Sequence, residues 1–169
     1  PKPYIAFMDG IVFGGGMGIS QGASHRIVTE RTKMAMPETG IGLFPDVGGG
    51  YFLSRCPGSV GEYLALTGQA IGGDDAVDCQ LADVQVPSTA LAGLWDALLA
   101  LQEGNTQSIE RLIATKKVAA YANIQRATAL NRIKIDEIFA LDSVLAILAA
   151  LERDGSACAL ETAATLRKR

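Results

Sequence analysis

The chain lacks the features that mark membrane-spanning and nucleic-acid-binding proteins. None of its apolar runs reaches the ~18 residues that a bilayer-spanning helix needs. Its formal net charge is −3, and its one dense basic cluster is Arg167-Lys168-Arg169 at the end of the sequence. A nucleic-acid-binding domain generally has a broad basic face or stripe. We therefore expect neither a membrane nor a nucleic acid as a partner.

Cysteine and histidine are scarce. The 169 residues include three cysteines and one histidine. The cysteines, which are odd in number and far apart in the sequence, are Cys56, Cys79 and Cys158. This spacing predicts neither a disulfide framework nor a zinc site, and it favours free thiols in a reducing compartment. No serine in a G-x-S-x-G motif accompanies His25, so we expect a packed or surface histidine and no metal centre.

The remaining composition is that of a soluble globular protein. Hydrophobic residues make up 49% of the chain and charged residues 20%. This length and balance are enough for one domain with a hydrophobic core. The sequence begins at Pro1, enters the apolar run 4–8 with no lead-in, and stops at Arg169 within a helical pattern. We therefore expect it to be an internal stretch of a longer protein.

Glycine is concentrated between residues 10 and 50, with short apolar runs around and within this stretch. The runs 4–8, 27–29 and 34–36 are bounded by turn residues, which is typical of buried strands. The segment 18–22 lies between two of them and can form a short helix. This order of strand, turn, helix and strand predicts an α/β fold with a parallel sheet and helices on its faces.

From residue 88 onward the sequence is helical in character and poor in glycine. We predict an α/β core over residues 1–87 and a helical region over 88–169, which is truncated at its end. Within the core, 59–68 has the apolar spacing of a helix that Gly68 would stop. Helix N-caps in the second region are predicted at Ser88 or Thr89, at Ser108 and at Asp142.

The glycine cluster from Gly14 to Gly18 stands between a predicted strand and a predicted helix. A dinucleotide fingerprint would need a glycine where Gln21 stands, and a P-loop would need a lysine between Lys2 and Lys33. A third interpretation is an anion pocket of backbone N–H groups, which could hold the oxyanion of a polarised thioester. A tight turn without a ligand fits the spacing equally well, so both interpretations stay open.

Two carboxylates stand on constrained loops. Glu38 directly follows a predicted strand and a proline, and Asp46 follows eight residues later, just before a run of glycines. A carboxylate held near backbone donors is suited to general-base or nucleophilic catalysis. Taken alone, however, Glu38 fits a solvated loop acid, and Asp46 fits the N-cap of a helix over 47–54. We expect Asp9, which precedes Gly10, to be a turn residue.

Several stretches of the sequence resemble one enzyme family. The matching stretches are Lys2-Pro3 through the apolar run to Asp9-Gly10, Gly14-Gly15-Gly16-Met17-Gly18, Ala35-Met36-Pro37-Glu38-Thr39, Gly42 to Leu53, Leu64-Ala65-Leu66-Thr67-Gly68, and Asp154-Gly155-Ser156 with Ala159-Leu160-Glu161. They are similar to the crotonase superfamily of enoyl-CoA hydratases and isomerases, and within it to the 3-hydroxyisobutyryl-CoA hydrolase branch. The resemblance implies a crotonase-like ββα-type core followed by a helical C-terminal region.

The resemblance also implies roles for single residues. Glu38 matches the catalytic glutamate of the family, and Asp46 matches an aspartate that contacts the substrate and assists it. Gly15 would donate one oxyanion-hole N–H, and Gly14 would line the substrate-binding site beside it. Typical enoyl-CoA hydratases carry a second catalytic glutamate where this chain has Gly18. Because alkene hydration is usually assigned two carboxylates, Gly18 favours thioester hydrolysis.

The implied reaction is the hydrolysis of a 3-hydroxyacyl-CoA thioester, with 3-hydroxyisobutyryl-CoA giving 3-hydroxyisobutyrate and coenzyme A in valine catabolism. An enoyl-CoA hydratase or isomerase is one alternative, and a non-catalytic acyl-CoA-binding or assembly subunit is another. No cofactor is implied, because coenzyme A enters as part of the substrate. Crotonase relatives commonly form trimers or hexamers, so a homo-oligomer stays open. The implied compartment is the bacterial cytoplasm or the mitochondrial matrix.

Overall fold

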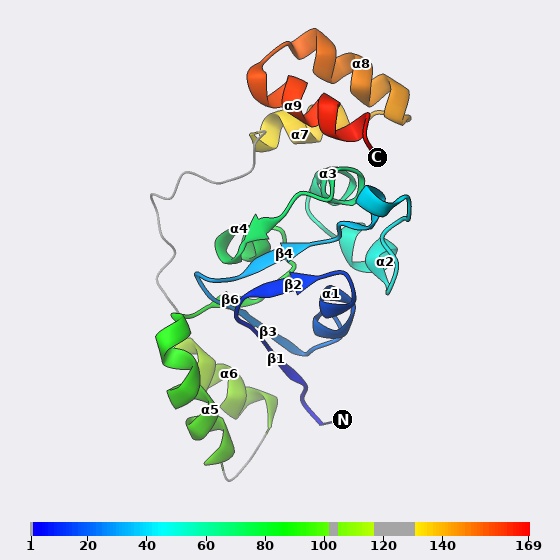
Figure 1. The fold of residues 1–169 in the computed structure, drawn as a ribbon. Helices are drawn as coiled ribbons and strands as arrows, with labels where there is room; N and C mark the ends of the chain where they lie inside the picture. Colours follow the sequence, from blue (N-terminus) through cyan, green and yellow to red (C-terminus); the bar gives the residue numbers. More distant parts are fainter. Residues whose placement is uncertain (1, 102–104, 117–130) are drawn as a thin grey trace.

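The computed structural model describes residues 2–101, 105–116 and 131–169. Strands and short helices from the N-terminal half of the chain form its centre (Figure 1). Two groups of longer helices, from the C-terminal half, lie on different sides of this centre. The predicted α/β class is confirmed.

The first sheet is parallel throughout. It contains β1 (Ile5–Met8), β3 (His25–Val28) and β6 (Val84–Gln85), with β3 between the other two. Ile27 and Val28 have no exposed surface, as expected for the middle strand of a covered parallel sheet. The strands predicted at 4–8 and 27–29 are confirmed, with small shifts at their ends.

The second sheet brings the glycine cluster and Glu38 to one edge. It contains β2 (Ile11–Phe13), β4 (Lys33–Ala35) and β5 (Ile71–Gly72). β2 and β4 are parallel, whereas β4 and β5 are antiparallel. Phe13 pairs with Ala35, so the chain leaves both strands at the same edge. In α/β sheets the carboxyl ends of parallel strands are where ligands bind.

Short helices connect the strands. They are α1 (Gly15–Ser20), the 3-10 turn η1 (Glu38–Ile41), α2 (Gly49–Leu53), α3 (Val60–Thr67) and α4 (Gly73–Asp78). α1 begins earlier than the predicted segment 18–22, because Gly14 at φ +50° already turns the chain into the helix. The helix predicted over 59–68 is confirmed as α3, and Gly68 ends it at φ +62°.

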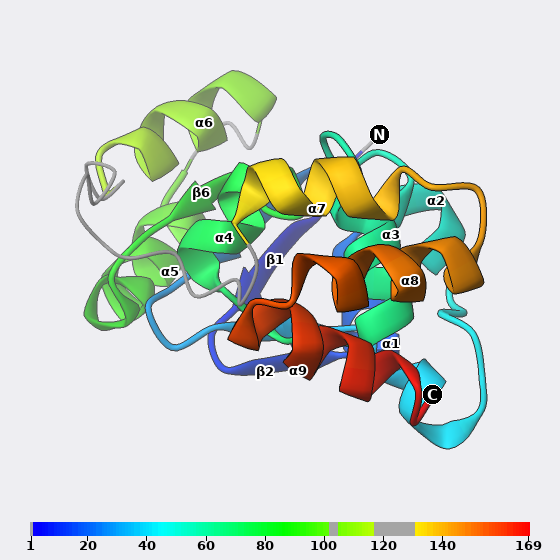
Figure 2. The ribbon, with the colours of Figure 1, turned by 90° about the horizontal axis from the view of Figure 1, so that it is seen from above.

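The helices after residue 87 pack on two parts of the molecule (Figures 1 and 2). They are the 3-10 turn η2 (Ser88–Ala90), α5 (Leu91–Leu99), α6 (Thr106–Ala114), α7 (Arg132–Phe139), α8 (Val144–Asp154) and α9 (Ala157–Leu166). α5 and α6 share a hydrophobic cluster with β3 and β6, whereas α7, α8 and α9 join the main core around α3. The division of the chain into two domains at residue 87 stays a prediction.

Three helix starts differ from their predicted N-caps. The Asn105 side chain caps α6 by accepting from the N–H of Ser108 at 2.9 Å, and the Ser143 hydroxyl caps α8 in the same way. α5 follows η2 without a side-chain cap. The caps predicted at Ser88 or Thr89, at Ser108 and at Asp142 are therefore wrong. Asn105 and Ser143 have the extended backbone of an N-cap, whereas Ser108 already lies within α6.

Candidate active site

Glu38 is buried at the edge where β4 ends. It begins η1, and its exposed fraction is 9%. Among the described residues, its Oε2 is the only buried side-chain oxygen or nitrogen that has no hydrogen-bond partner. A buried carboxylate oxygen without a partner costs free energy, so a protein that retains one generally uses it to bind or react. The solvated-loop interpretation of Glu38 is therefore wrong.

The glycine cluster lies against this carboxylate. A Cβ atom on Gly14 would stand 2.7 Å from Oε1 of Glu38, so any other residue here would displace this carboxylate, and the φ of +50° also favours glycine. The N–H of Gly14 donates to the carbonyl of Ala35 at 3.1 Å, which holds the turn to β4. Gly15 follows as the first residue of α1 and is exposed. Because first-turn N–H groups have no acceptor within a helix, the N–H of Gly15 can bind an external oxygen.

Asp46 lies in the exposed loop between η1 and α2. The N-cap of α2 is Gly48, in a left-handed conformation, and no side chain caps this helix. Asp46 contributes only its carbonyl, which accepts from the N–H of Gly49 at 2.6 Å. The predicted role of Asp46 as the cap of a helix over 47–54 is therefore wrong. Its carboxylate remains exposed to solvent beside Val47.

Val47 joins this loop to α1. A Cβ atom on Gly18 would stand 2.6 Å from Cβ and 2.7 Å from Cγ2 of Val47, so the valine covers the bare backbone of the helix. Val47 itself has φ +43°, which is rare for a β-branched residue. Sequence reasoning missed Val47, although its place between the aspartate and the glycine run was a signal for unusual backbone.

η1 is attached to the C-terminal end of α3. The hydroxyl of Thr39 donates to the carbonyl of Leu66 at 3.4 Å. Nη2 of Arg169 donates to the carbonyl of Thr67 at 2.9 Å, and its guanidinium occupies the space that a side chain on Gly40 would take. The segment that carries Glu38 is thus held by α3 and by Arg169, which lies beyond the end of α9.

Asp9 does more than turn the chain between β1 and β2. Its carboxylate accepts from the hydroxyl of Thr29 at 2.6 Å and from that of Ser88 at 3.1 Å. Arg31 lies 3.5 Å away as an ion-pair partner. These contacts connect the loops after β1, β3 and β6, so we assign Asp9 a structural role.

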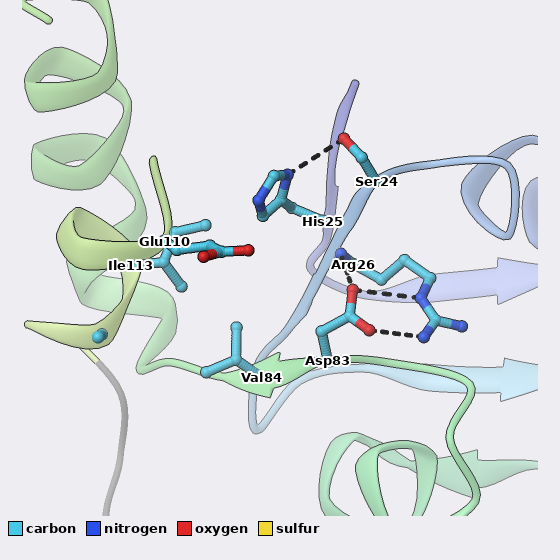
Figure 3. A pocket seen from close by; sticks show the side chains of 8 residues that line it. Ser24, His25, Arg26, Asp83, Val84, Glu110 and Ile113 are labelled. Atoms are coloured by element: carbon cyan, nitrogen blue, oxygen red, sulfur yellow. Dashed lines mark hydrogen bonds and ion pairs between the residues drawn. The ribbon is translucent and has the colours of Figure 1, made fainter. Parts of the chain in front are cut away.

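His25 lines a different cavity, of about 410 Å³, between the sheet and α6 (Figure 3). The side chain is buried at the start of β3, and its Nδ1 lies 3.1 Å from the hydroxyl of Ser24. The expectation of a packed histidine is confirmed. Arg26 in the same wall is held by Asp83 at 2.6 Å. This cavity does not include Glu38 or the glycine cluster.

The three cysteines are free thiols, as predicted. Burial raises the pKa of Cys56 to about 11 and that of Cys79 to about 12, so neither is a reactive thiolate near neutral pH. Within the described ranges, no three histidine, cysteine or acidic side chains come together as metal ligands. In the same part of the chain, no helix is both long and apolar enough to cross a membrane.

A family model described as enoyl-CoA hydratase/isomerase matches residues 1–169. The mitochondrial 3-hydroxyisobutyryl-CoA hydrolase of Danio rerio is 41% identical over 169 residues, which is 99% of this chain and 44% of that protein. A carnitinyl-CoA dehydratase structure from Mycobacterium thermoresistibile has a TM-score of 0.88 and 40% identity, over 100% of this chain and 47% of that one. An enoyl-CoA hydratase structure from Rhodobacter sphaeroides has a TM-score of 0.80 and 34% identity, over 99% of this chain and 46% of that one.

The chain therefore spans less than half the length of these relatives. Over that span, the similarity confirms both the predicted crotonase-like fold and the resemblance to 3-hydroxyisobutyryl-CoA hydrolases. The parallel strands, the glycine turn and the buried Glu38 lie within the matched residues. The chain belongs to the enoyl-CoA hydratase/isomerase family.

Proposed function

We propose that the complete protein hydrolyses a 3-hydroxyacyl-CoA thioester, with 3-hydroxyisobutyryl-CoA as the expected substrate in valine catabolism. The observation that carries the proposal is the buried Oε2 of Glu38, which has no hydrogen-bond partner, beside the glycines that open α1. The name of the Danio rerio relative supports the choice of substrate. Coenzyme A arrives with this substrate, and the proposed reaction uses no cofactor and no metal.

The glycine turn would bind the reacting carbonyl. The N–H of Gly15 donates to the thioester oxygen, and a second donor comes from a segment of the protein outside this chain. Such fixed donors stabilise the negative charge that develops on this oxygen during the reaction. Each donor raises the turnover rate by a factor of about 10²–10³. Gly14 allows Glu38 to approach the same carbonyl because it has no side chain.

Glu38 would act by one of two routes. As a general base it takes a proton from water, whose oxygen bonds to the carbonyl carbon. The carbon–sulfur bond then breaks and the coenzyme A sulfur takes a proton. As a nucleophile, Glu38 bonds to the carbonyl carbon while the carbon–sulfur bond breaks, which gives a mixed anhydride and the coenzyme A thiolate. Water then opens the anhydride and frees Glu38, and one of the protons that water releases goes to the thiolate. Asp46, exposed near Val47, orients the substrate hydroxyl or the water.

Hydration of an enoyl-CoA is the second candidate. The names of the two related structures, a dehydratase and a hydratase, favour it. The bare backbone at Gly18 argues against it, because this position offers no second carboxylate.

The Danio rerio relative carries the word mitochondrial in its name, which supports the mitochondrial matrix over the bacterial cytoplasm. A homo-oligomer stays a prediction.

The two candidates are separated by assaying the complete protein on both substrates. Thiol release from 3-hydroxyisobutyryl-CoA is followed with a thiol reagent, and hydration of crotonyl-CoA by loss of its enoyl absorbance. We expect thiol release without hydration. Hydration without thiol release would replace the hydrolase by the hydratase. Binding of both substrates with neither reaction would favour a non-catalytic acyl-CoA-binding subunit.

A further inference from the structure

Val47 has a backbone conformation that its own packing does not explain. Val47 and Gln80 are the non-glycine residues with positive φ in the described part of the chain, and Val47 is the β-branched one. Its φ of +43° is disfavoured for such a side chain. The side chain is 48% exposed, so burial in the core does not compensate for the strain. Strain of this kind is often retained at functional sites.

The strained valine fills the position where residue 18 would place a side chain. A Cβ on Gly18 would meet Cβ of Val47 at 2.6 Å and Cγ2 at 2.7 Å, and the carbonyl of Val47 at 3.0 Å. The first two contacts are closer than side chains tolerate, and the third is tight. Val47 therefore requires glycine at position 18, and it closes this position to any other side chain.

Glu38 and Val47 cover consecutive turns of one helix face. The N–H of Gly18 donates to the carbonyl of Gly14 at 3.1 Å, so the two glycines stand one turn apart, about 6 Å along the helix. The carboxylate of Glu38 lies against Gly14, and the valine lies against Gly18. One turn along α1 from the reacting carboxylate, this helix face is thus covered by an apolar group.

We propose that Val47 is a specificity-determining residue: it closes the second turn of α1, so that Glu38 works without a polar partner one turn away. The proposal rests on the proposed function, which supplies the reaction. Addition of water to an alkene needs a base for the water and an acid for the carbon. Thioester hydrolysis needs one base or nucleophile, because the leaving sulfur readily accepts the proton. An apolar second turn therefore favours hydrolysis.

The packing is tested in the complete protein by a double-mutant cycle of Gly18→Ala and Val47→Gly. Gly18→Ala alone should lower the melting temperature by at least about 3 °C, because it overpacks the contact. The same change should cost little in the Val47→Gly background. Equal losses in both backgrounds would overturn the proposal. This readout does not depend on activity, so it separates the proposal from the proposed function.

The specificity is tested by placing glutamate at position 18, with and without Val47. In the Gly18→Glu/Val47→Gly protein, the ratio of crotonyl-CoA hydration to thiol release should rise about tenfold or more. The reason is that a positioned acid or base raises a reaction rate by a factor of about 10²–10⁴. Gly18→Glu alone should not raise it. Gln80→Gly is the matched control, because it removes the other positive-φ residue and should leave the ratio unchanged. An equal rise in Gly18→Glu alone, or no rise in a folded double variant, would overturn the proposal.

Discussion

Glu38 and Gly14 define the chemistry at the scale of single residues. The carboxylate occupies its present position against the turn because Gly14 has no side chain. The backbone turn also needs a residue at position 14 that adopts a φ of +50°, which glycine does at little cost. One glycine therefore serves both the backbone and the placement of the reacting group.

Replacing Gly14 by alanine tests this contact. The new Cβ would meet Oε1 of Glu38 at 2.7 Å on a backbone with positive φ. We expect the free energy of unfolding to fall by about 1–3 kcal/mol and thiol release to fall about tenfold or more. Gly16→Ala is the matched stability control, because the atom nearest to its Cβ is 3.7 Å away. Denaturant unfolding and initial rates measure both effects, and equal destabilisation in the two variants would contradict the account.

The buried thiols predict how stability changes in alkali. The pKa values of Cys56 and Cys79 rise from 9.0 to about 11 and about 12 because burial disfavours the thiolate. The folded state thus holds these protons more tightly than the unfolded state. Their stabilising contribution is complete below pH 9 and is lost as the pH rises towards 11–12. The urea midpoint should fall across this window.

The double variant Cys56→Ala/Cys79→Ala should show a shallower fall than the parent, with each protein compared with its own midpoint at pH 7. A part of the fall should remain, because burial also raises the pKa of Tyr63 to about 12. The measurement is urea unfolding between pH 7 and 11. The same loss in both proteins would mean that the two thiols do not couple stability to pH.

At the scale of elements, the N-caps show what local sequence decides and what it leaves open. The hydroxyl of Ser143, which caps α8, accepts from the N–H of Ala146 at 3.2 Å. Ser143→Ala should therefore lower the free energy of unfolding by about 1 kcal/mol. Asp142→Ala removes the neighbouring polar side chain, which does not cap, and should change it by less than about 0.5 kcal/mol. Thermal unfolding compares the two, and a larger loss for Asp142→Ala would reverse the assignment.

Elements with strong local signals could be predicted, and those held by long-range pairing could not. α3 has helical spacing and a terminal glycine, so both its existence and its end follow from the sequence. β5 and β6 have two residues each, which is too short for an alternating pattern. The approach of Glu38 to Gly14 depends on the pairing of β2 with β4, which no local pattern specifies.

The same distinction applies to the candidate site. Position on constrained loops marks Glu38 and Asp46 as candidate catalytic carboxylates, and the resemblance assigns roles to them and to Gly15; these roles in catalysis remain predictions. Residue chemistry alone fits a solvated acid at Glu38, because burial is a property of the folded chain. Val47 gave no chemical signal, because its importance comes from a backbone angle and a contact with α1.

At the scale of the whole molecule, the site lies where the sheet and the C-terminal helices meet. The edge of the second sheet supplies Gly14 and Glu38, while α3 and Arg169 hold η1 from the other side. α7, α8 and α9 pack around α3 in the main core, and α5 and α6 pack apart from it. We therefore expect the former group to affect catalysis more than the latter.

The central claim is that Glu38 carries thioester hydrolysis. The most direct measurement is thiol release from 3-hydroxyisobutyryl-CoA by the complete protein, by Glu38→Gln and by Glu161→Gln, which changes an exposed acid on α9. We predict that Glu38→Gln stays folded and loses activity by about 10² or more, as expected for a positioned base or nucleophile, while Glu161→Gln keeps the parent rate. A folded Glu38→Gln protein that releases thiol at the parent rate would contradict the account.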